Sequence, residues 1–424
     1  MPRLQGPAGL MFAGTLAYAF GRGIYGTSII VFFSLTLRFS ATQIGAALSG
    51  AGIAALLIAL PTGYLADRWG SRRLAIMVAV VQSGLVIPFL ITDSYAALLP
   101  CVIAIGAADR ANSIVRRTLV SHVIGESERV RFQAYLRSTA NVGMSLAALI
   151  VAPLLAVASR MAFTFLLSVT MGAFAVVAVV TARLPAGSRP GPPPPPTGVS
   201  RQEAPRARTR RLTAFAGLGL VNGLLALHIS ILNVALPLWI TKHTAAPTWI
   251  VSALILVNTV LAVAFQVTLS RTSSTVRGAA ATLATSSLFT ALACVLFAAT
   301  ADRAGLLVVA GLLLAVIALT IGELLQSAGE WGLSFGLAPV RSQGRYVGAF
   351  SIGTALQDIA GPIVVVALAI VHVPGGWLTL SLIVLVSGGS VVSLTRWAAR
   401  GGPASELIHQ PRPRGLGEAP KGTA

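Results

Sequence analysis

The chain has 424 residues, of which 55% are hydrophobic and only 10% are charged, and its formal net charge is +19. Soluble proteins carry about 25% charged residues, so this composition excludes an ordinary water-soluble globular protein. Apolar stretches of about 20 residues, each long enough to cross roughly 30 Å of hydrocarbon, recur along almost the whole chain. The sequence therefore predicts an all-α membrane protein that crosses the bilayer many times.

Twelve transmembrane helices are expected between the charged or Pro- and Gly-rich breaks. In chain order we predict them at residues 9–37, 42–66, 74–92, 96–120, 131–158, 161–183, 212–241, 247–270, 276–300, 304–329, 345–372 and 375–398. The first six would form one bundle and the last six a second bundle.

The longest hydrophilic break, residues 184–211, contains the run Pro192–Pro196 followed by several arginines. Such a segment is typical of a semi-rigid linker. The sequence therefore predicts four parts. These are an N-terminal six-helix bundle at 1–183, a cytoplasmic linker at 184–211, a C-terminal six-helix bundle at 212–399 and a disordered cytoplasmic tail at 400–424.

The 31 Lys and Arg residues follow the expected topology. Most lie in segments on the same side as the N-terminus, and the opposite side is expected to carry only Arg38, Arg160, Lys242 and Arg303. By the positive-inside rule, both termini and the linker are then cytoplasmic. The basic segments would contact anionic lipid at that face, so the net charge does not indicate a nucleic-acid partner.

No motif of a soluble enzyme stands in the sequence. It lacks the phosphate-binding pattern G-x-x-x-x-G-K-[ST], the pattern H-E-x-x-H and any Cys/His cluster with metal-ligand spacing. Cys101 and Cys294 each lie alone in an apolar segment. We expect neither an enzyme nor a bound cofactor or metal.

Ionisable side chains inside apolar helices are costly unless they face a cavity or a partner, so each is a functional candidate. Polar side chains, ionisable ones among them, recur in every third predicted helix. The members of this polar set are Tyr18, Arg22 and Tyr25 in the first, Asp109, Arg110 and Asn112 in the fourth, Asn222, His228 and Asn233 in the seventh, and Glu323 and Gln326 in the tenth.

An internal repeat supports two related halves. Asp109-x-x-Asn112-Ser113 matches Glu323-x-x-Gln326-Ser327, and an arginine, Arg131 or Arg345, follows each acid at the same spacing. Parallel repeats of this kind build many secondary transporters.

The sequence GYLADRWGSRR at residues 63–73 resembles the G-x-x-x-D-R-x-G-R-R signature of the major facilitator superfamily. The matching residues are Gly63, Asp67, Arg68, Gly70, Arg72 and Arg73. Together with the twelve spans and the central linker, the chain is identified as a member of this superfamily. The resemblance implies that helices 1, 4, 7 and 10 line a central substrate cavity, so we expect the polar set to lie there.

The segment from Gly322 to Gly348, and a second one at Arg137–Gly143, resemble bacterial drug and metabolite exporters. The resemblance implies a bacterial cytoplasmic membrane and a monomer. The glycine-rich antiporter signature expected on the fifth helix is missing, because Val151-Ala152-Pro153 stands there and Gly361-Pro362 occurs on the eleventh instead.

The carboxyls of the membrane helices are the expected proton-coupling residues, since burial lets a carboxyl bind and release a proton near neutral pH. Asp109 and Glu323 rank first and Asp358, on the eleventh helix, third. The alternative for each of the first two is a permanent ion pair; for Asp109 the partners considered are Arg110, Arg116 and Arg137.

Two further residues keep alternatives open. Arg22 would hold an anionic substrate group or bias a nearby acid, or it would form a structural pair with Asp109 or Glu323. His228 suits a proton path but would otherwise be a packing residue. Of the aromatic residues, Tyr18 and Tyr25 are the expected cavity contacts, whereas Trp239 and Trp249 are expected in the interfacial belt at the outer face.

A gate is expected at the 63–73 segment, because an acid at a helix C-terminus opposes the helix dipole and needs a partner. The resemblance places Asp67 near Gly344 and Arg345, with Arg116 or Arg117 also in reach. Gly63 would allow close helix approach and Gly70 a tight turn. A basic loop that only fixes orientation would explain Arg68, Arg72 and Arg73, though not Asp67.

The predicted function is proton-driven efflux of a drug-like or secondary-metabolite molecule by alternating access. One rival is uptake of a small organic anion bound by Arg22 and Arg110. The other is a sensor or assembly factor that moves nothing. Replacing Glu323 with Gln is expected to abolish coupling to a pH gradient.

Overall fold

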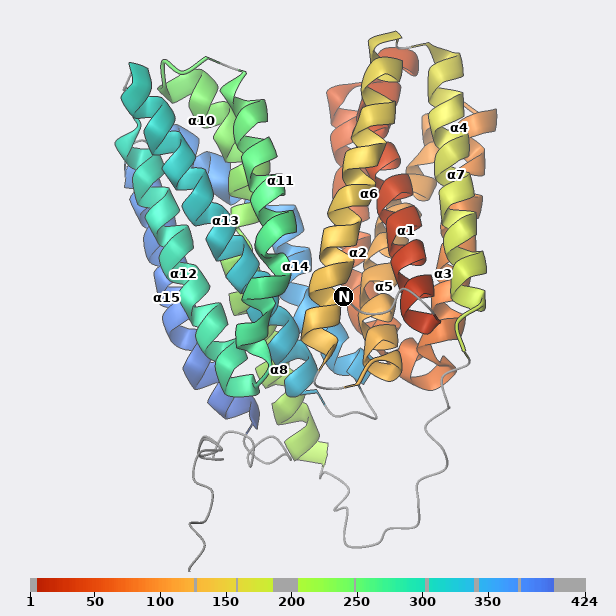
Figure 1. The fold of residues 1–424 in the computed structure, drawn as a ribbon. Helices are drawn as coiled ribbons and strands as arrows, with labels where there is room; N and C mark the ends of the chain where they lie inside the picture. The colour runs from red at the N-terminus through yellow and green to blue at the C-terminus, as the bar shows by residue number, and fades with distance from the viewer. Residues whose placement is uncertain are drawn as a thin grey trace, which may run out of the picture.

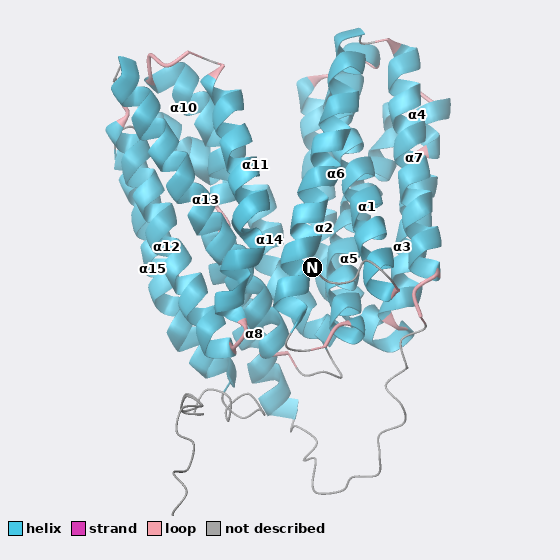
Figure 2. Cartoon of the chain, in the orientation of Figure 1, coloured by secondary structure: helices cyan, strands magenta, loops and turns pink. Residues whose placement is uncertain are grey.

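The computed structural model describes residues 6–125, 128–157, 159–185, 205–247, 249–301, 305–338, 343–372 and 375–399. The predicted tail at 400–424 and residues 186–204 of the predicted linker lie outside these ranges. In the part of the chain that the structure describes, twelve helical spans are long and apolar enough to cross a membrane. Helices are joined by short loops (Figure 2). The predicted all-α membrane class is confirmed.

Six spans form the N-terminal half. They are α1 (Pro7–Val31) with its π-helical end η1 (Phe32–Thr36), α2 (Ala41–Trp69), α3 (Ser71–Leu85) with α4 (Ile87–Ile91), α5 (Tyr95–Val123), α6 (Arg129–Val157) and α7 (Arg160–Ala182). A capping box between Ser40 and Gln43 starts α2. Gly70 ends it with φ of 89°, a conformation that favours glycine.

Six spans form the C-terminal half. They are α8 (Pro205–Leu225) with α9 (His228–Ser230), η3 (Ile231–Ala235) and α10 (Leu236–His243), then α11 (Ile250–Leu269) with η4 (Ser270–Ser273), α12 (Val276–Ala299), α13 (Gly305–Gly336), α14 (Gln343–Val365) with η6 (Val366–Val371), and α15 (Gly375–Ala399).

The seventh span differs from the sequence expectation in two ways. α8 begins at Pro205, inside the segment assigned to the linker, and the span expected as one helix at 212–241 is interrupted after Leu225 by a turn and a π-helix. Pro237 follows this break at the first turn of α10. Proline has no N–H to bond to the preceding turn, so the regular helical ladder cannot continue there.

The two halves stand side by side and diverge toward one end (Figure 1). We call the end where α7 stops and α8 starts the linker side and the opposite end the far side. The halves meet through α2 with α14, α5 with α14, and α6 with α11. An apolar cluster that includes Met11, Leu119 and Trp331 joins the halves further.

Backbones of the two halves touch where α2 crosses α14. A Cβ added to Gly63 would lie 2.2 Å from the carbonyl oxygen of Gly344, and one added to Gly344 would lie 2.5 Å from that of Gly63. Gly348 lies equally tight against the Ala59 carbonyl oxygen, at 2.7 Å from an added Cβ. Small residues at such a crossing replace side-chain packing by direct helix contact.

The expected aromatic belt is half wrong. Trp249 is 67% exposed, but Trp239 is fully buried in the core of the C-terminal half, where its Nε1 donates to Thr300 Oγ1 at 2.9 Å. Trp239 also packs edge-on against Trp377. Hydropathy locates a helix end but not the face on which a residue lies, which is why this placement fails.

Candidate functional site

Asp109, on α5, is the centre of a polar group inside the N-terminal half. Its Oδ1 accepts hydrogen bonds from Tyr18 of α1 at 2.8 Å and from Gln82 of α3 at 2.7 Å. Its Oδ2 pairs with Arg22 Nε at 3.4 Å. All these partners belong to the same half, and the partner of Arg22 is Asp109 rather than Glu323.

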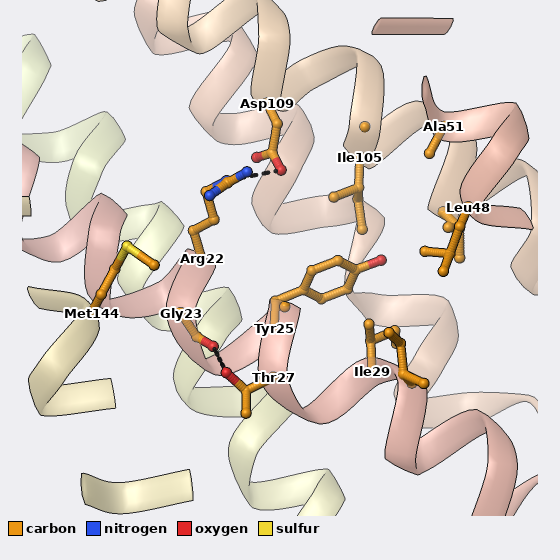
Figure 3. Close-up of a pocket in the computed structure, with 14 residues that line it drawn as sticks. Arg22, Gly23, Tyr25, Thr27, Ile29, Leu48, Ala51, Ile105, Asp109 and Met144 are labelled. Atoms are coloured by element: carbon orange, nitrogen blue, oxygen red, sulfur yellow. Dashed lines mark hydrogen bonds and ion pairs between the residues drawn. The ribbon is translucent and has the colours of Figure 1, made fainter. Parts of the chain in front are cut away.

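A pocket of about 300 Å³ opens beside the Arg22–Asp109 pair (Figure 3). Tyr25 lies in its wall, packed edge-on against Phe89, and its hydroxyl is buried without a described partner. The remaining lining residues are mostly apolar and come from α1, α2, α5 and α6, with Ile30, Leu48, Val102 and Met144 among them. An apolar pocket with a few convergent polar groups is the usual form of a small-molecule site.

The next residue on α5, Arg110, points to the other half. It donates to Asp358 Oδ2 at 2.5 Å and to Thr354 Oγ1 at 3.1 Å, both on α14. Asp358 is 56% exposed whereas Arg110 is 12% exposed. Arg110 was predicted to line the substrate cavity, and the structure places it in a cross-half ion pair with the exposed Asp358. Asp358, ranked lower by its position on the eleventh helix, lies at the interface.

Glu323 of α13 forms a second cross-half ion pair. Arg137 of α6 donates to its Oε1 at 2.7 Å, and Asn258 of α11 donates to its Oε2 at 3.0 Å and to Thr320 Oγ1 at 3.0 Å. The Glu323 side chain is only 12% exposed. The carboxylate is therefore held by a cation from the opposite half and an amide from its own half.

A third cross-half ion pair joins Arg117 of α5 to Glu330 of α13. Gln326 donates to Glu330 Oε2 at 3.1 Å and to Asn222 Oδ1 at 2.7 Å. Asn222 and Gln326 are buried, at 0% and 3% exposure. They were expected to line the cavity; neither lines the described pocket, and Gln326 links Asn222 to Glu330.

Asp67, at the linker-side end of α2, binds the first turn of α14. Its Oδ1 accepts from the Gly344 N–H at 2.8 Å and its Oδ2 from the Arg345 N–H at 3.0 Å. The carboxylate thus binds the positive end of a helix dipole in the opposite half. Gly63 lies one turn earlier on α2 and makes the close contact with Gly344 described above.

The arginines near this contact take separate places. The Arg345 guanidinium lies 5.3 Å from the Tyr64 ring centroid, again across the halves. Arg72 donates to the Ala182 carbonyl at the end of α7. Arg68 and Arg73 are exposed.

Neither Arg116 nor Arg117 binds Asp67, which corrects the expectation that they would. Arg117 pairs with Glu330. Arg116 stays in its own half, where it donates to Thr15 Oγ1 and to the Gly14 carbonyl at 3.3 Å and lies 5.5 Å from the Tyr18 ring centroid. One residue along a helix turns a side chain by about 100°, so these neighbours face different halves.

Three other residues of the polar set lie away from the pocket. Asn112 is buried at 1% exposure with an unpartnered Nδ2, and His228 is buried at 2% with Nδ1 3.1 Å from the Leu225 carbonyl. Asn233 is exposed and donates to the Ile229 carbonyl of its own turn at 2.8 Å. None of the three lines the pocket.

Sequence reasoning did not select Gln82, Asn258 or Glu330. Glu330 carried a usable signal, because residues 323, 326 and 330 share one helical face at spacings of three and four. Gln82 and Asn258 are single polar residues in apolar spans, and only the fold brings them to an acid. No group of three or more His, Cys, Asp or Glu side chains that would hold a metal occurs in the described residues.

The described part of the chain is a membrane protein of two six-helix halves that are joined by ion pairs toward one side and carry a pocket in one half. The profile of the Major Facilitator Superfamily matches residues 11–362, and the chain belongs to that family. It is therefore a membrane transporter of small molecules, and the family does not comprise enzymes.

Solved structures of the family share this fold at low sequence identity. A bacterial homologue of the iron transporter ferroportin in an outward-facing state has a TM-score of 0.70 and 14% identity, covering 93% of this chain and 100% of that one. The E. coli transporter FucP in the outward conformation has a TM-score of 0.65 and 15% identity, covering 93% and 99%. The human organic anion transporter MFSD10 (TETRAN) has a TM-score of 0.63 and 16% identity, covering 94% and 100%. No curated protein sequence matches the chain.

Proposed function

We propose that the protein is a proton-coupled exporter of drug-like or secondary-metabolite molecules in a bacterial cytoplasmic membrane. The observation that carries this proposal is the position of Asp109, an acid on the wall of a largely apolar pocket and bonded only within its own half. Such a carboxyl can exchange a proton with the pocket while the cross-half ion pairs stay intact.

The proposed orientation places the linker side in the cytoplasm, in agreement with the positive-inside rule. The described conformation is then outward-open, and Asp67, Glu323 and Glu330 are among the groups that close the cytoplasmic side. The inward-open state requires these contacts to break while the halves rock about the pocket. Each contact contributes free energy to one state only, which is what shifts a two-state equilibrium.

Coupling is assigned to two carboxyls with different tasks. Asp109 takes up the proton from the outer side. Glu323 holds Arg137 of the opposite half, and its protonation would remove the charge that keeps this pair together. Loss of the charge on Glu323 favours the opening of the cytoplasmic side, and protons are released there.

Flux into proteoliposomes under an imposed pH gradient, measured with a broad panel of lipophilic drugs and organic acids, tests the proposal. Export requires that drug accumulation in vesicles of inverted orientation rise when their lumen is acidic and collapse when a protonophore is added. Drug flux that ignores the gradient for every compound contradicts proton coupling.

A second function, uptake of a small organic anion, is favoured by one observation: the Arg22 side chain is 52% exposed at the pocket. The same assay separates the two, because uptake would move organic acids together with protons and leave cationic drugs behind. Absence of any flux across the panel would favour the third reading, a non-transporting sensor or assembly factor. A monomer is expected to be sufficient for transport, which reconstitution at one copy per vesicle tests.

A further inference from the structure

Two ion pairs start from neighbouring residues of α5 and together form a charged row of four side chains: Arg22 on α1, Asp109 and Arg110 on α5, and Asp358 on α14. The row begins with a cation of the N-terminal half and ends with an anion of the C-terminal half. Ion pairs join its first and second members and its third and fourth, and the middle two are neighbours in sequence. The formal charge of the row is zero.

The two ends of the row are open and the middle is covered. Arg22 and Asp358 are 52% and 56% exposed, whereas Asp109 and Arg110 are 22% and 12% exposed. Exposed charge facing lipid is expensive, so these ends face the polar space between the halves. Of the described residues, only Asp109 bonds to Arg22, through Nε, and only Arg110 bonds to Asp358, through Oδ2. The Nη groups of Arg22 and the Oδ1 of Asp358 are therefore available to a ligand.

The open ends have opposite signs, and both belong to ion pairs that start from neighbouring residues of α5. A ligand with a single charge gains attraction at one end and repulsion at the other. A ligand that carries both charges gains attraction at both ends. The net charge of the row together with its ligand stays zero. Each such contact is stronger in this partly enclosed space than between the same charges in bulk water.

We propose that the substrate is amphoteric, with an anionic group bound by Arg22, an ammonium group bound by Asp358 and an apolar body against the pocket wall. This inference rests on the proposed function and names its substrate class. The apolar lining around Ile30, Leu48 and Met144 suits an aromatic or alicyclic body.

The same contact would connect binding to conformational change. The substrate ammonium competes with Arg110 for Asp358, and that ion pair is a link between the halves. It is the most exposed of the three cross-half ion pairs in the described residues, because the acids of the other two, Glu323 and Glu330, are 12% and 8% exposed. Substrate can therefore reach this link before the others open.

Equilibrium binding to the purified full chain tests the proposal with matched triads of probes. Each triad contains a zwitterion, its methyl ester, which keeps only the cation, and its N-acetyl derivative, which keeps only the anion. Phenylalanine, 4-(aminomethyl)benzoic acid and norfloxacin supply three separations of the two charges. We expect at least one zwitterion to bind about tenfold or more tightly than both of its derivatives. Equal binding of an ester or an N-acetyl compound in every triad, or no binding by any probe, overturns the proposal.

Single substitutions assign the two ends. Arg22→Gln should remove the advantage of the zwitterion over the ester, and Asp358→Asn its advantage over the N-acetyl derivative. Arg22→Lys and Asp358→Glu should restore a part of each advantage, which separates charge recognition from loss of folding. The matched control is Arg160→Gln, which removes one charge from an exposed ion pair with Asp93 elsewhere in the same half and should leave all ratios unchanged.

Failure of this inference can be told from failure of the proposed function. Selective binding of zwitterions without flux driven by a pH gradient contradicts proton-coupled export alone. Gradient-driven flux of singly charged drugs, with equal binding across each triad, contradicts the amphoteric substrate alone.

Discussion

The predicted internal repeat aligns Asp109 with Glu323, yet the two acids are bonded in opposite ways. Asp109 is bound by Tyr18, Arg22 and Gln82 of its own half. Glu323 is bound by Arg137 of the opposite half as well as by Asn258 of its own. The first set of contacts can survive a rocking motion of the halves, whereas the second cannot.

The difference shows that two matching positions of a sequence repeat can hold acids with different kinds of partner, one within its own half and one across the halves. In all three cross-half ion pairs of the described residues the cation, Arg110, Arg117 or Arg137, stands on the N-terminal half and the acid on the C-terminal half. Each of these C-terminal acids therefore loses its cation when the halves separate at its position. The cation that pairs with Asp109 stands in the same half, so Asp109 can exchange a proton with the pocket while the cross-half ion pairs stay intact.

The largest effect is expected from Asp109→Asn. The amide cannot take up a proton, so flux driven by a pH gradient should fall about 100-fold, while the cross-half contacts and the distribution of conformations stay as they are. Gradient-driven flux tests the loss of coupling, and cysteine accessibility at the far side tests the unchanged distribution of conformations. Both are measured on the same variant. If proton coupling persists in Asp109→Asn, uptake of the coupled proton by Asp109 is contradicted.

Glu323→Gln should lower gradient-driven flux at least about tenfold and, unlike Asp109→Asn, should also change the conformational equilibrium. Breaking a buried pair by removing one partner costs about 3–5 kcal/mol. Because Arg137 is 35% exposed, we expect about 1–2 kcal/mol here. The readout is increased labelling of a cysteine placed on the linker side of α13, in a background where Cys101 and Cys294 are replaced.

The control for that substitution is Arg137→Gln in the same background. If the ion pair is the whole cause, Arg137→Gln should shift labelling in the same direction as Glu323→Gln, and the double variant should add little to either. Unchanged coupling and unchanged labelling in Glu323→Gln together would contradict both tasks assigned to Glu323.

The sequence predicts the membrane spans well and the partners of the buried charges poorly, for a physical reason. Hydropathy over about 20 residues locates each membrane helix, and all twelve are present. The partner of a buried charge depends on helix rotation and tilt, which hydropathy does not encode. The sequence therefore leaves Asp109 or Glu323 open as the partner of Arg22, and it offers no way to place Gln82 beside Asp109. The turn after Leu225 likewise escapes, because hydropathy averaged over a whole span does not mark a local turn within it.

Gly63→Ala tests the backbone contact that accompanies the ion pairs. Its Cβ would lie 2.2 Å from the Gly344 carbonyl oxygen, so α2 and α14 must move apart. Overpacking of this kind costs about 1–3 kcal/mol, which should raise linker-side labelling roughly fivefold or more. Gly45→Ala is the matched control in the same helix, since nothing lies within 4 Å of its added Cβ, and it should behave like the unaltered protein. Equal effects of the two substitutions would contradict a gate at this crossing.

Asp67→Asn should have the smallest effect and answers why an acid stands among the basic residues at 63–73. The amide oxygen can still accept a hydrogen bond from the N–H of Gly344 or of Arg345. The amide has only one acceptor oxygen and no negative charge, so it cannot replace both hydrogen bonds of the carboxylate. Losing one charge-assisted bond costs about 1–2 kcal/mol, less a part recovered from water. Linker-side labelling should therefore rise about threefold to tenfold while the orientation of the chain is unchanged.

The exposed Arg73 supplies the opposite test. Arg73→Gln keeps every described contact of Asp67 and removes only a basic charge from the loop, so it should leave labelling of the linker side unchanged. If Asp67 acted merely within a basic loop that fixes orientation, the two substitutions would be equivalent in this assay. A rise confined to Asp67→Asn assigns the acid to the contact between the halves and leaves orientation to the surrounding arginines.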